Sequence, residues 1–145
     1  MSIMICKVCG HIAYGSAPEN CPVCYAPKTS FQQNDNIFIE SEEKSKEASV
    51  KHIPTIKVNK ECRLVPEQPC IDVIVRVGKT LHPMEEAHHI QFIDCYVDKK
   101  FVSRVQLTAG VFAAACFHLK AAGSTVQIVE NCNLHGYWQS EAPLN

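Results

Sequence analysis

The fold is decided by residues 89–107, which read HIQFIDCYVDKKFVSRVQL. Two runs rich in residues that favour β-strands, 89–97 and 101–107, flank the polar tripeptide Asp98-Lys99-Lys100. Two such runs joined by a short polar turn are typical of a β-hairpin. The sequence therefore predicts a pair of antiparallel strands in this region.

Further strands are expected on both sides of the hairpin. Residues 71–77 (IDVIVRV) alternate as in a strand with one buried face, and residues 124–130 give another strand. Several short strands with turn signals within about 95 residues indicate an antiparallel β-sandwich. One stretch disagrees: residues 108–122 (TAGVFAAACFHLKAA) are rich in alanine, and propensity alone favours a helix there.

Length and composition limit the classes of protein to which the chain can belong. Its 145 residues are 46% hydrophobic and carry a formal net charge of −1. That length allows one real core and a small appended domain, and the near-neutral charge argues against a nucleic-acid or anionic-membrane partner. No apolar run approaches the roughly 20 residues that span a bilayer, and the start lacks a basic signal-peptide region. We therefore expect a cytoplasmic protein.

The chain is expected to fall into three parts. Residues 1–35 are dense in Cys, Gly and Pro. Such a segment cannot fold on hydrophobic burial alone and needs a stabilising cross-link such as a bound metal. Residues 36–49 are polar and predict a solvated linker, with a short strand at 37–39 before its most charged part. Residues 50–145 carry the strand patterns of the β-sandwich.

Four of the nine cysteines form two C-x-x-C pairs, CKVC at residues 6–9 and CPVC at residues 21–24. In a reducing compartment such cysteines indicate metal ligands or reactive thiols rather than a disulfide framework. Four thiolates in a tetrahedral arrangement select zinc or iron. The residues concerned are Cys6, Cys9, Cys21 and Cys24.

Residues 6–31, with CGHIAYG, CPVC and APK, resemble the rubredoxin-like module of rubrerythrins. That resemblance implies a single iron bound by the four cysteines and carrying one electron at a time, with zinc as a possible substitute. The family usually has glycine after the last cysteine, whereas this chain has Tyr25. If that position needs a positive φ, Tyr25 carries a strain of about 1 kcal/mol.

The histidines gather in three short motifs. KHIP lies at residues 51–54, HPMEEAHHI at 82–90 and CNLHG at 132–136. Each motif alone is a weak signal, because a lone histidine is more often structural than a ligand. Together they offer imidazole and thiolate groups, the mixture expected around a redox-active transition metal.

These three motifs, in this order, resemble the iron-binding motifs of superoxide reductases, the desulfoferrodoxin and neelaredoxin family. The resemblance spans about residues 50–140 and implies an immunoglobulin-like β-sandwich that holds one ferrous iron near its surface. It also implies strands and loops, not a helix, in residues 108–122. Carried over motif by motif, the ligands would be His52, His82, His88 and His135 around the metal, with Cys132 as the axial thiolate.

The resemblance also implies the chemistry. Such a site reduces superoxide to hydrogen peroxide, with Lys51 attracting the anion and helping to deliver protons. The family's glutamate two residues before the first ligand is replaced here by Val50, so we expect the sixth position of the oxidised iron to stay open to solvent or an anion. Two irons per chain, a homodimer and an external electron donor such as rubredoxin or a reductase complete the expectation.

Several residues are expected to lie outside the chemistry. His89, His11 and His118 match no ligand position, and Tyr137 and Trp138 are expected to pack beside the metal site. The remaining cysteines, expected to be small buried hydrophobic residues, are Cys62, Cys70, Cys95 and Cys116. Two other functions remain open at this point: a non-enzymatic iron or electron carrier, and a zinc-ribbon interaction module.

Overall fold

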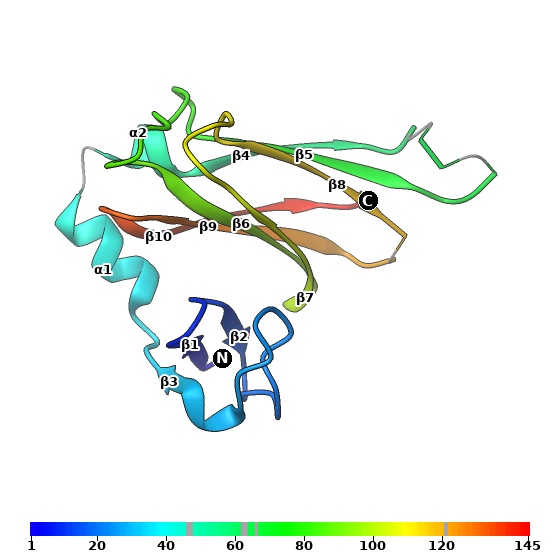
Figure 1. Ribbon diagram of the computed structural model, residues 1–145. Helices are drawn as coiled ribbons and strands as arrows, with labels where there is room; N and C mark the ends of the chain where they lie inside the picture. The colour runs from blue at the N-terminus through cyan, green and yellow to red at the C-terminus, as the bar shows by residue number, and fades with distance from the viewer. Residues whose placement is uncertain (46–47, 62–63, 66, 121) are drawn as a thin grey trace.

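The structure is a computed structural model that describes residues 1–45, 48–61, 64–65, 67–120 and 122–145. It consists of a small N-terminal module and a larger two-layer β-sandwich, joined by a short helix (Figure 1). Within the described residues, no helix is both long enough and apolar enough to cross a lipid bilayer. The predicted fold class, a metal-knuckle domain followed by an immunoglobulin-like antiparallel sandwich, is confirmed.

The N-terminal module is a three-stranded antiparallel sheet with the order β2-β1-β3. Its core within the described residues is small and includes two of the predicted ligands, Cys6 and Cys21, beside Ala17 and Phe31. A core of this size supplies little hydrophobic stabilisation, which agrees with the expected metal staple. The elements are β1 (Ile3–Cys6), β2 (Ile12–Tyr14), the 3-10 turn η1 (Lys28–Ser30) and β3 (Phe31–Gln33).

The helix α1 (Ile37–Lys44) occupies most of the expected linker, so the prediction of a strand at residues 37–39 is wrong. Phe38 and Ser41 are its buried residues, three positions apart on one face, and that face packs against β10. This helical spacing is the signal that the strand prediction missed. Residues 46–47 of the charged run lie outside the described residues, and the division into 1–35, 36–49 and 50–145 stays a prediction.

Two antiparallel sheets form the sandwich, with the strand orders β4-β5-β8 and β10-β9-β6-β7. A short helix, α2 (Ser49–His52), leads into the first sheet. The strands are β4 (Pro54–Asn59), β5 (Ile71–Val77), β6 (Ile90–Val97), β7 (Lys100–Gln106), β8 (Ala114–Leu119), β9 (Thr125–Cys132) and β10 (Gly136–Pro143).

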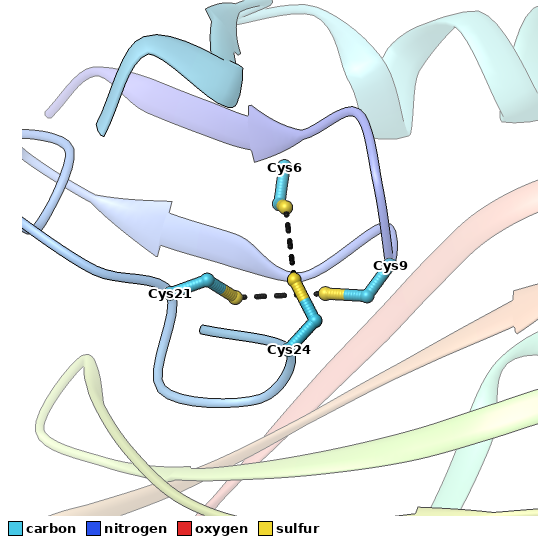
Figure 2. Close-up of side chains that lie close together, drawn as sticks. All are labelled: Cys6, Cys9, Cys21 and Cys24. Carbon is cyan, nitrogen blue, oxygen red and sulfur yellow. Dashed lines mark hydrogen bonds between the residues drawn. The ribbon is translucent and has the colours of Figure 1, made fainter. Parts of the chain in front are cut away.

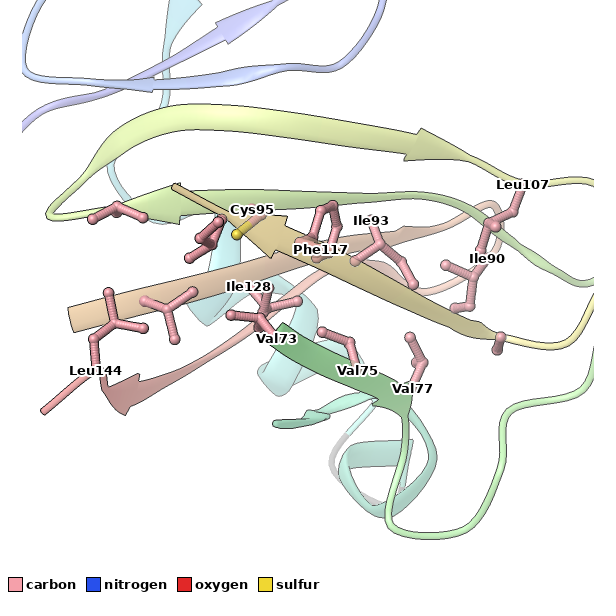
Figure 3. Packing of buried hydrophobic residues seen from close by; sticks show 14 of the residues in the cluster. Val73, Val75, Val77, Ile90, Ile93, Cys95, Leu107, Phe117, Ile128 and Leu144 are labelled. Carbon is pink, nitrogen blue, oxygen red and sulfur yellow. The ribbon is translucent and has the colours of Figure 1, made fainter. Parts of the chain in front are cut away.

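The hairpin predicted from residues 89–107 is confirmed as β6 and β7. Its two-residue turn places Asp98 at φ +48° and Lys99 at φ +67°, as a type I′ turn requires. On β5, Val73, Val75 and Val77 are buried and alternate with more exposed residues, as the pattern predicts. These valines meet side chains of the other sheet, such as Ile93 and Ile128, in the sandwich core (Figure 3).

The alanine-rich stretch forms loop and strand, as the family resemblance implied, and not the helix that propensity favours. Within β8, Phe117 and Leu119 are buried and alternate with exposed Cys116 and His118. Pairing with β5 supplies the backbone hydrogen bonds, and the sandwich core takes up the apolar face. Tertiary context therefore overrides local propensity here.

The cysteines outside the metal motifs behave differently from one another. Cys95 is fully buried, as predicted, but Cys116 is exposed on the outer face of β8, so its predicted burial is wrong. Cys70 is buried but takes part in a disulfide bond instead of acting as a free thiol. Cys62 lies outside the described residues.

The N-terminal module docks on the outer face of the four-stranded sheet through buried polar contacts. Arg104 on β7 donates to both carboxylate oxygens of Asp94 on β6, at 2.6 and 2.9 Å, and to the backbone carbonyl of Cys9, at 2.9 Å. The Tyr96 hydroxyl donates to the Ile12 carbonyl at 2.6 Å. Because this face is covered, nearly every residue of β6 is buried, whichever sheet face it occupies.

Asp94 is expected to be essential for this docking. Replacing it by alanine leaves the Arg104 cation buried without its carboxylate, a change that typically costs about 3–5 kcal/mol. We expect Asp94→Ala to lower the free energy of unfolding by this amount in urea titrations followed by circular dichroism. Lys99→Ala is the control, because it removes an exposed ion pair to Glu141 and should cost less than about 1 kcal/mol. Equal losses in the two variants would contradict the assignment.

Candidate metal centres

The first centre is formed by the two cysteine loops of the N-terminal module (Figure 2). The sulfurs of Cys6 and Cys24 lie 3.6 Å apart and those of Cys9 and Cys21 lie 3.5 Å apart. All four sulfurs are within 4.8 Å of one another. Four sulfurs each about 2.3 Å from one tetrahedral metal would be about 3.8 Å apart, so the arrangement fits a single zinc or iron.

Each cysteine loop is closed by a backbone hydrogen bond across the turn. The Gly10 amide donates to the Cys6 carbonyl and the Tyr25 amide donates to the Cys21 carbonyl, both at 2.9 Å. Gly10 and Tyr25 follow the second cysteine of their loops and have φ of +80° and +68°. The condition under which strain was expected at Tyr25, a positive φ, is thus met, and its side chain is 80% exposed.

The thiols of this centre need a cation to become thiolates together. Burial raises the pKa of Cys9 and of Cys21, which disfavours their charged forms, whereas at Cys24 burial is outweighed by hydrogen bonds, which lower the pKa. A bound metal ion supplies the compensating positive charge and releases the protons. The donor set therefore fits a thiolate-bound metal better than four free thiols.

The second centre lies at one end of the sandwich, where three separate segments converge. His52 ends α2, His82 and His88 belong to the loop between β5 and β6, and Cys132 ends β9. The metal-binding atoms of these four residues all lie within 4.8 Å of one another. His135, in the turn between β9 and β10, places its Nδ1 atom 3.7 Å from the Cys132 sulfur.

The four imidazole rings are arranged around a square. Neighbouring ring centroids are separated by 4.5 Å for His52–His82, 4.6 Å for His82–His88, 5.0 Å for His88–His135 and 4.9 Å for His135–His52. The diagonal pair His52–His88 is 6.3 Å apart. This is the pattern expected of four ligands around one metal in a plane. The structure thus brings together all five side chains that the motifs indicated.

The ring nitrogens point in the directions that metal binding requires. Nδ1 of His52 lies 2.7 Å from the Ala48 carbonyl and Nδ1 of His82 lies 2.6 Å from the Pro83 carbonyl. Each Nδ1 therefore carries the proton and donates, which leaves Nε2 as the free lone pair. The two Nε2 atoms are 3.0 Å apart, the separation of two nitrogens each about 2.1 Å from one metal at a right angle.

Two further observations concern the contacts of the ligand atoms among the described residues. Nε2 of His88 is buried and has no hydrogen-bond partner among the described residues. The Cys132 sulfur, also buried, lies 3.6 Å from Nε2 of His82. A buried lone pair without a partner is costly, and a metal ion would satisfy it. The residues present therefore fit one metal with mixed nitrogen and sulfur ligands.

The electrostatics keep the imidazoles in the neutral form that binds metals. Burial lowers the pKa of His82 to about 4, and burial also lowers the pKa of His52 and of His88. Repulsion from the neighbouring rings and the positive charge of Lys51 lower the pKa of His52 and His88 further. Lys51 itself is exposed beside its neighbour His52.

The backbone fixes α2, and therefore His52, against the loop that follows β5. The Lys79 amide donates to the Val50 carbonyl at 2.7 Å. Gly78 has φ +90°, and a Cβ atom there would lie 2.5 Å from the Lys51 carbonyl oxygen. Only glycine allows this close approach.

Trp138 stacks on the His52 ring, with the centroids 5.1 Å apart, and donates from Nε1 to the His135 carbonyl at 3.1 Å. Its predicted position beside the site is confirmed. Tyr137 instead points to the N-terminal module, where its hydroxyl donates to the Gly10 carbonyl at 2.7 Å. The prediction that Tyr137 packs beside the metal site is therefore wrong for its side chain.

The remaining histidines lie outside the cluster. His89 directs its Nδ1 atom to the Glu85 carbonyl, and His118 lies on the outer face of the other sheet beside Asp72. His11 is buried in the interface between the modules, with Nδ1 3.4 Å from Asp94.

Glu130 is a residue near the site that the sequence reasoning missed. It lies on β9, two residues before Cys132, and is fully buried. Neither carboxyl oxygen has a hydrogen-bond partner among the described residues, and burial raises the pKa well above its usual value. The only signal in the sequence was an acidic residue at the end of the strand predicted at residues 124–130.

Comparisons with known proteins agree with this geometry. The family model described as desulfoferrodoxin matches residues 42–141, and the model described as rubrerythrin, rubredoxin-like domain, matches residues 5–32. The chain is 32% identical over 144 residues to a desulfoferrodoxin of Syntrophotalea carbinolica, covering 97% of this chain and 96% of the relative. It is 35% identical over 107 residues to a superoxide reductase of Pyrococcus abyssi, covering 65% of this chain and 87% of that one.

Solved structures show the same likeness. A neelaredoxin-type superoxide reductase of Ignicoccus hospitalis superimposes with a TM-score of 0.59 at 26% identity, covering 74% of this chain and 90% of that one. A superoxide reductase of Nanoarchaeum equitans gives a TM-score of 0.53 at 28% identity, covering 65% of this chain and 93% of that one.

The buried Glu130 predicts a pH-dependent cost in stability. Its folded-state pKa is raised, so as the pH rises above about 4.3 the unfolded chain loses this proton first and folding becomes less favourable. Glu130→Gln does not titrate. We therefore expect its free energy of unfolding, relative to the wild type, to increase as the pH rises from about 5 to about 8, by up to about 1.4 kcal/mol per pH unit.

Urea titrations at matched metal content measure this difference. Glu42→Gln, at an exposed position on α1, is the control for exchanging a surface glutamate for glutamine. A pH-independent difference for Glu130→Gln would show that the buried carboxyl is ionised or paired.

Proposed function

The chain belongs to the desulfoferrodoxin family, and from this premise we propose that it reduces superoxide to hydrogen peroxide at the second centre. The observation that carries the proposal is the square of four imidazoles closed by Cys132, because this ligand set is built for a redox metal. The family, the rubredoxin-like region and an oxidoreductase assignment rest on the comparisons. The reaction itself is the step that we add.

An iron held by His52, His82, His88, His135 and Cys132 would supply one electron to superoxide, which with two protons becomes hydrogen peroxide. The buried thiolate of Cys132 donates electron density to its metal, as cysteine ligands do in other iron enzymes. His88 and His135 are only partly buried, unlike His52 and His82, so one edge of the site is near the surface. A substrate as small as superoxide needs no deeper pocket.

Lys51 is the proposed catalytic residue of the protein itself. It is exposed, it directly precedes His52, and its charge is close enough to lower the pKa of both His52 and His88. A cation at the mouth of the site attracts a small anion and raises its local concentration. Its ammonium group also holds protons that the product requires.

Val50 supports the proposal that the sixth position stays open. The family's glutamate could bind an oxidised metal there, but the 51% exposed Val50 side chain has no atom that coordinates. We propose that solvent or an external anion occupies this position after turnover. The proposed reaction does not need the missing carboxylate as an electron or proton source.

The four-cysteine centre is proposed to hold a second iron that passes electrons to the catalytic site. Its donor set fits iron and zinc equally, and zinc would make the module purely structural. The proposed partners are superoxide and an external electron donor such as rubredoxin or a reductase. We further propose a homodimer in the cytoplasm, with no membrane or nucleic-acid partner.

The decisive experiment is anaerobic rapid mixing of the reduced protein with superoxide, combined with metal analysis. We expect two irons per chain, thiolate-to-iron charge-transfer bands, and stoichiometric peroxide without release of oxygen. His52→Ala should lose superoxide consumption by more than about 100-fold, since even residues that only orient a ligand are typically worth about 10–100-fold. The spectrum of the four-cysteine centre should be unchanged.

His89→Ala is the matched control, because His89 adjoins a ligand but directs its ring elsewhere. It should retain the activity. Zinc at both centres would contradict the proposed enzyme and indicate a structural module. Reversible oxidation of the iron without formation of peroxide would indicate an electron carrier. Full activity in His52→Ala would remove that residue from the site.

Lys51 is tested through the ionic-strength dependence of the reaction. We expect Lys51→Ala to lower the second-order rate constant for superoxide by about tenfold at low salt and to weaken its salt dependence. Lys51→Arg should retain most of the rate because it keeps the charge. Lys57→Ala, at an exposed position on β4, is the control for a change of net charge alone. An unchanged rate in Lys51→Ala would exclude the proposed role.

A further inference from the structure

The contact between the N-terminal module and the sandwich joins residues that lie close in the chain to ligands of the two metal centres. Gly10 follows Cys9, a ligand of the first centre, and its carbonyl accepts a 2.7 Å hydrogen bond from the Tyr137 hydroxyl. Tyr137 lies at the start of β10, two residues after His135, a ligand of the second centre. One hydrogen bond therefore connects a covalent path from Cys9 with a covalent path to His135.

This contact is tightly packed. Gly10 has φ +80°, and a Cβ atom there would lie 2.8 Å from the Tyr137 hydroxyl oxygen and 3.3 Å from the Phe92 ring. A side chain at position 10 would separate the two modules, so glycine permits the approach. On the other side, the Ser41 hydroxyl of α1 accepts a 3.0 Å hydrogen bond from the Tyr137 amide. The tyrosine is thus fixed at its hydroxyl and at its backbone.

The Tyr137 hydroxyl is the donor in this hydrogen bond, because the Gly10 carbonyl oxygen can only accept. Strand pairing also joins Tyr137 to the axial ligand of the second centre. Its register partner on β9 is Asn131, which directly precedes Cys132, while Gly136 pairs with Cys132 itself.

Two other hydrogen bonds across this interface, made by Tyr96 and Arg104, lead away from the second centre. Tyr96 donates to the Ile12 carbonyl at 2.6 Å, but it stands near the far end of β6, beside Val97 and the Asp98 turn. Arg104 reaches the Cys9 carbonyl at 2.9 Å, but it belongs to β7, which carries none of the proposed ligands. Of these three contacts, only the one made by Tyr137 has proposed metal ligands close to both partners. Cys9 directly precedes Gly10, and His135 lies two residues before Tyr137.

The geometry points to Tyr137 as the residue through which an electron passes from the four-cysteine centre to the superoxide site of the same chain. This inference rests on the proposed function and extends it. In the step, one ferrous iron at the first centre becomes ferric and one ferric iron at the second becomes ferrous, so the electrons balance. The rate of electron tunnelling falls more steeply across a gap than along covalent bonds and hydrogen bonds. The Tyr137 hydroxyl matters because its hydrogen bond bridges the gap to Gly10.

The test follows electron transfer by absorbance in the full-length protein loaded with iron at both centres. The reduced protein is mixed anaerobically with less than one equivalent of superoxide. We expect a fast phase in which the second centre is oxidised and peroxide forms. In the next phase, the ferric bands of the four-cysteine centre should grow as those of the second centre decay, at a rate independent of protein concentration.

Tyr137→Phe should slow this second phase several-fold and leave the fast phase unchanged, and Tyr137→Leu, which also removes the ring, should slow it further. Tyr96→Phe is the matched control, because it removes an equivalent interface hydrogen bond that leads to no ligand of the second centre. Its second phase should match the wild type. Midpoint potentials and thermal unfolding of each variant verify that both centres and the fold are retained.

The outcomes separate the two proposals. Absence of the fast phase would overturn the proposed function, and flash photoreduction of the oxidised protein would still measure transfer between the centres. Three results for the rate of the second phase would overturn the path through Tyr137. The rate could be the same in wild type and Tyr137→Phe, it could fall equally in Tyr96→Phe, or it could rise in proportion to protein concentration.

Discussion

Buried ligand atoms that no protein group satisfies are the constraint on which this structure depends. Nε2 of His88 has no hydrogen-bond partner among the described residues, and two Nε2 atoms face each other at 3.0 Å. The thiols of Cys9 and Cys132 are disfavoured as thiolates by burial. Burying such lone pairs without a partner is costly, and a bound cation would pair with them, so both centres fit a metal ion.

The two centres depend on the fold in different ways. Four cysteines within one small module need only two turns, each closed by a single backbone hydrogen bond. The second centre gathers ligands from α2, from the loop before β6 and from the β9–β10 turn, so it exists only when both sheets of the sandwich are in place. The outer face of one sheet then serves as the docking surface for the first module. The Gly10–Tyr137 hydrogen bond across this interface joins residues that lie close in the chain to ligands of the two centres.

The sequence allowed much of this to be predicted, and the failures have physical causes. The hairpin and the strand at 71–77 followed from local patterns. The strand at residues 37–39 was wrong, because a short apolar run does not distinguish a strand from a helix packed on a distant surface. The burial of Cys116 was also wrong, since residue type does not reveal which sheet face is exposed.

By itself, the sequence determined the ligand types, their grouping into motifs and the apolar patterns typical of strands, because these depend on neighbours along the chain. Only the tertiary structure decided that four imidazoles form a square, that Glu130 is buried with no hydrogen-bond partner in the described part of the chain, and that Tyr137 faces the other module. These features depend on side chains that are up to 127 positions apart in the chain. Contacts of that kind are fixed by how sheets and modules pack, and no local pattern records them.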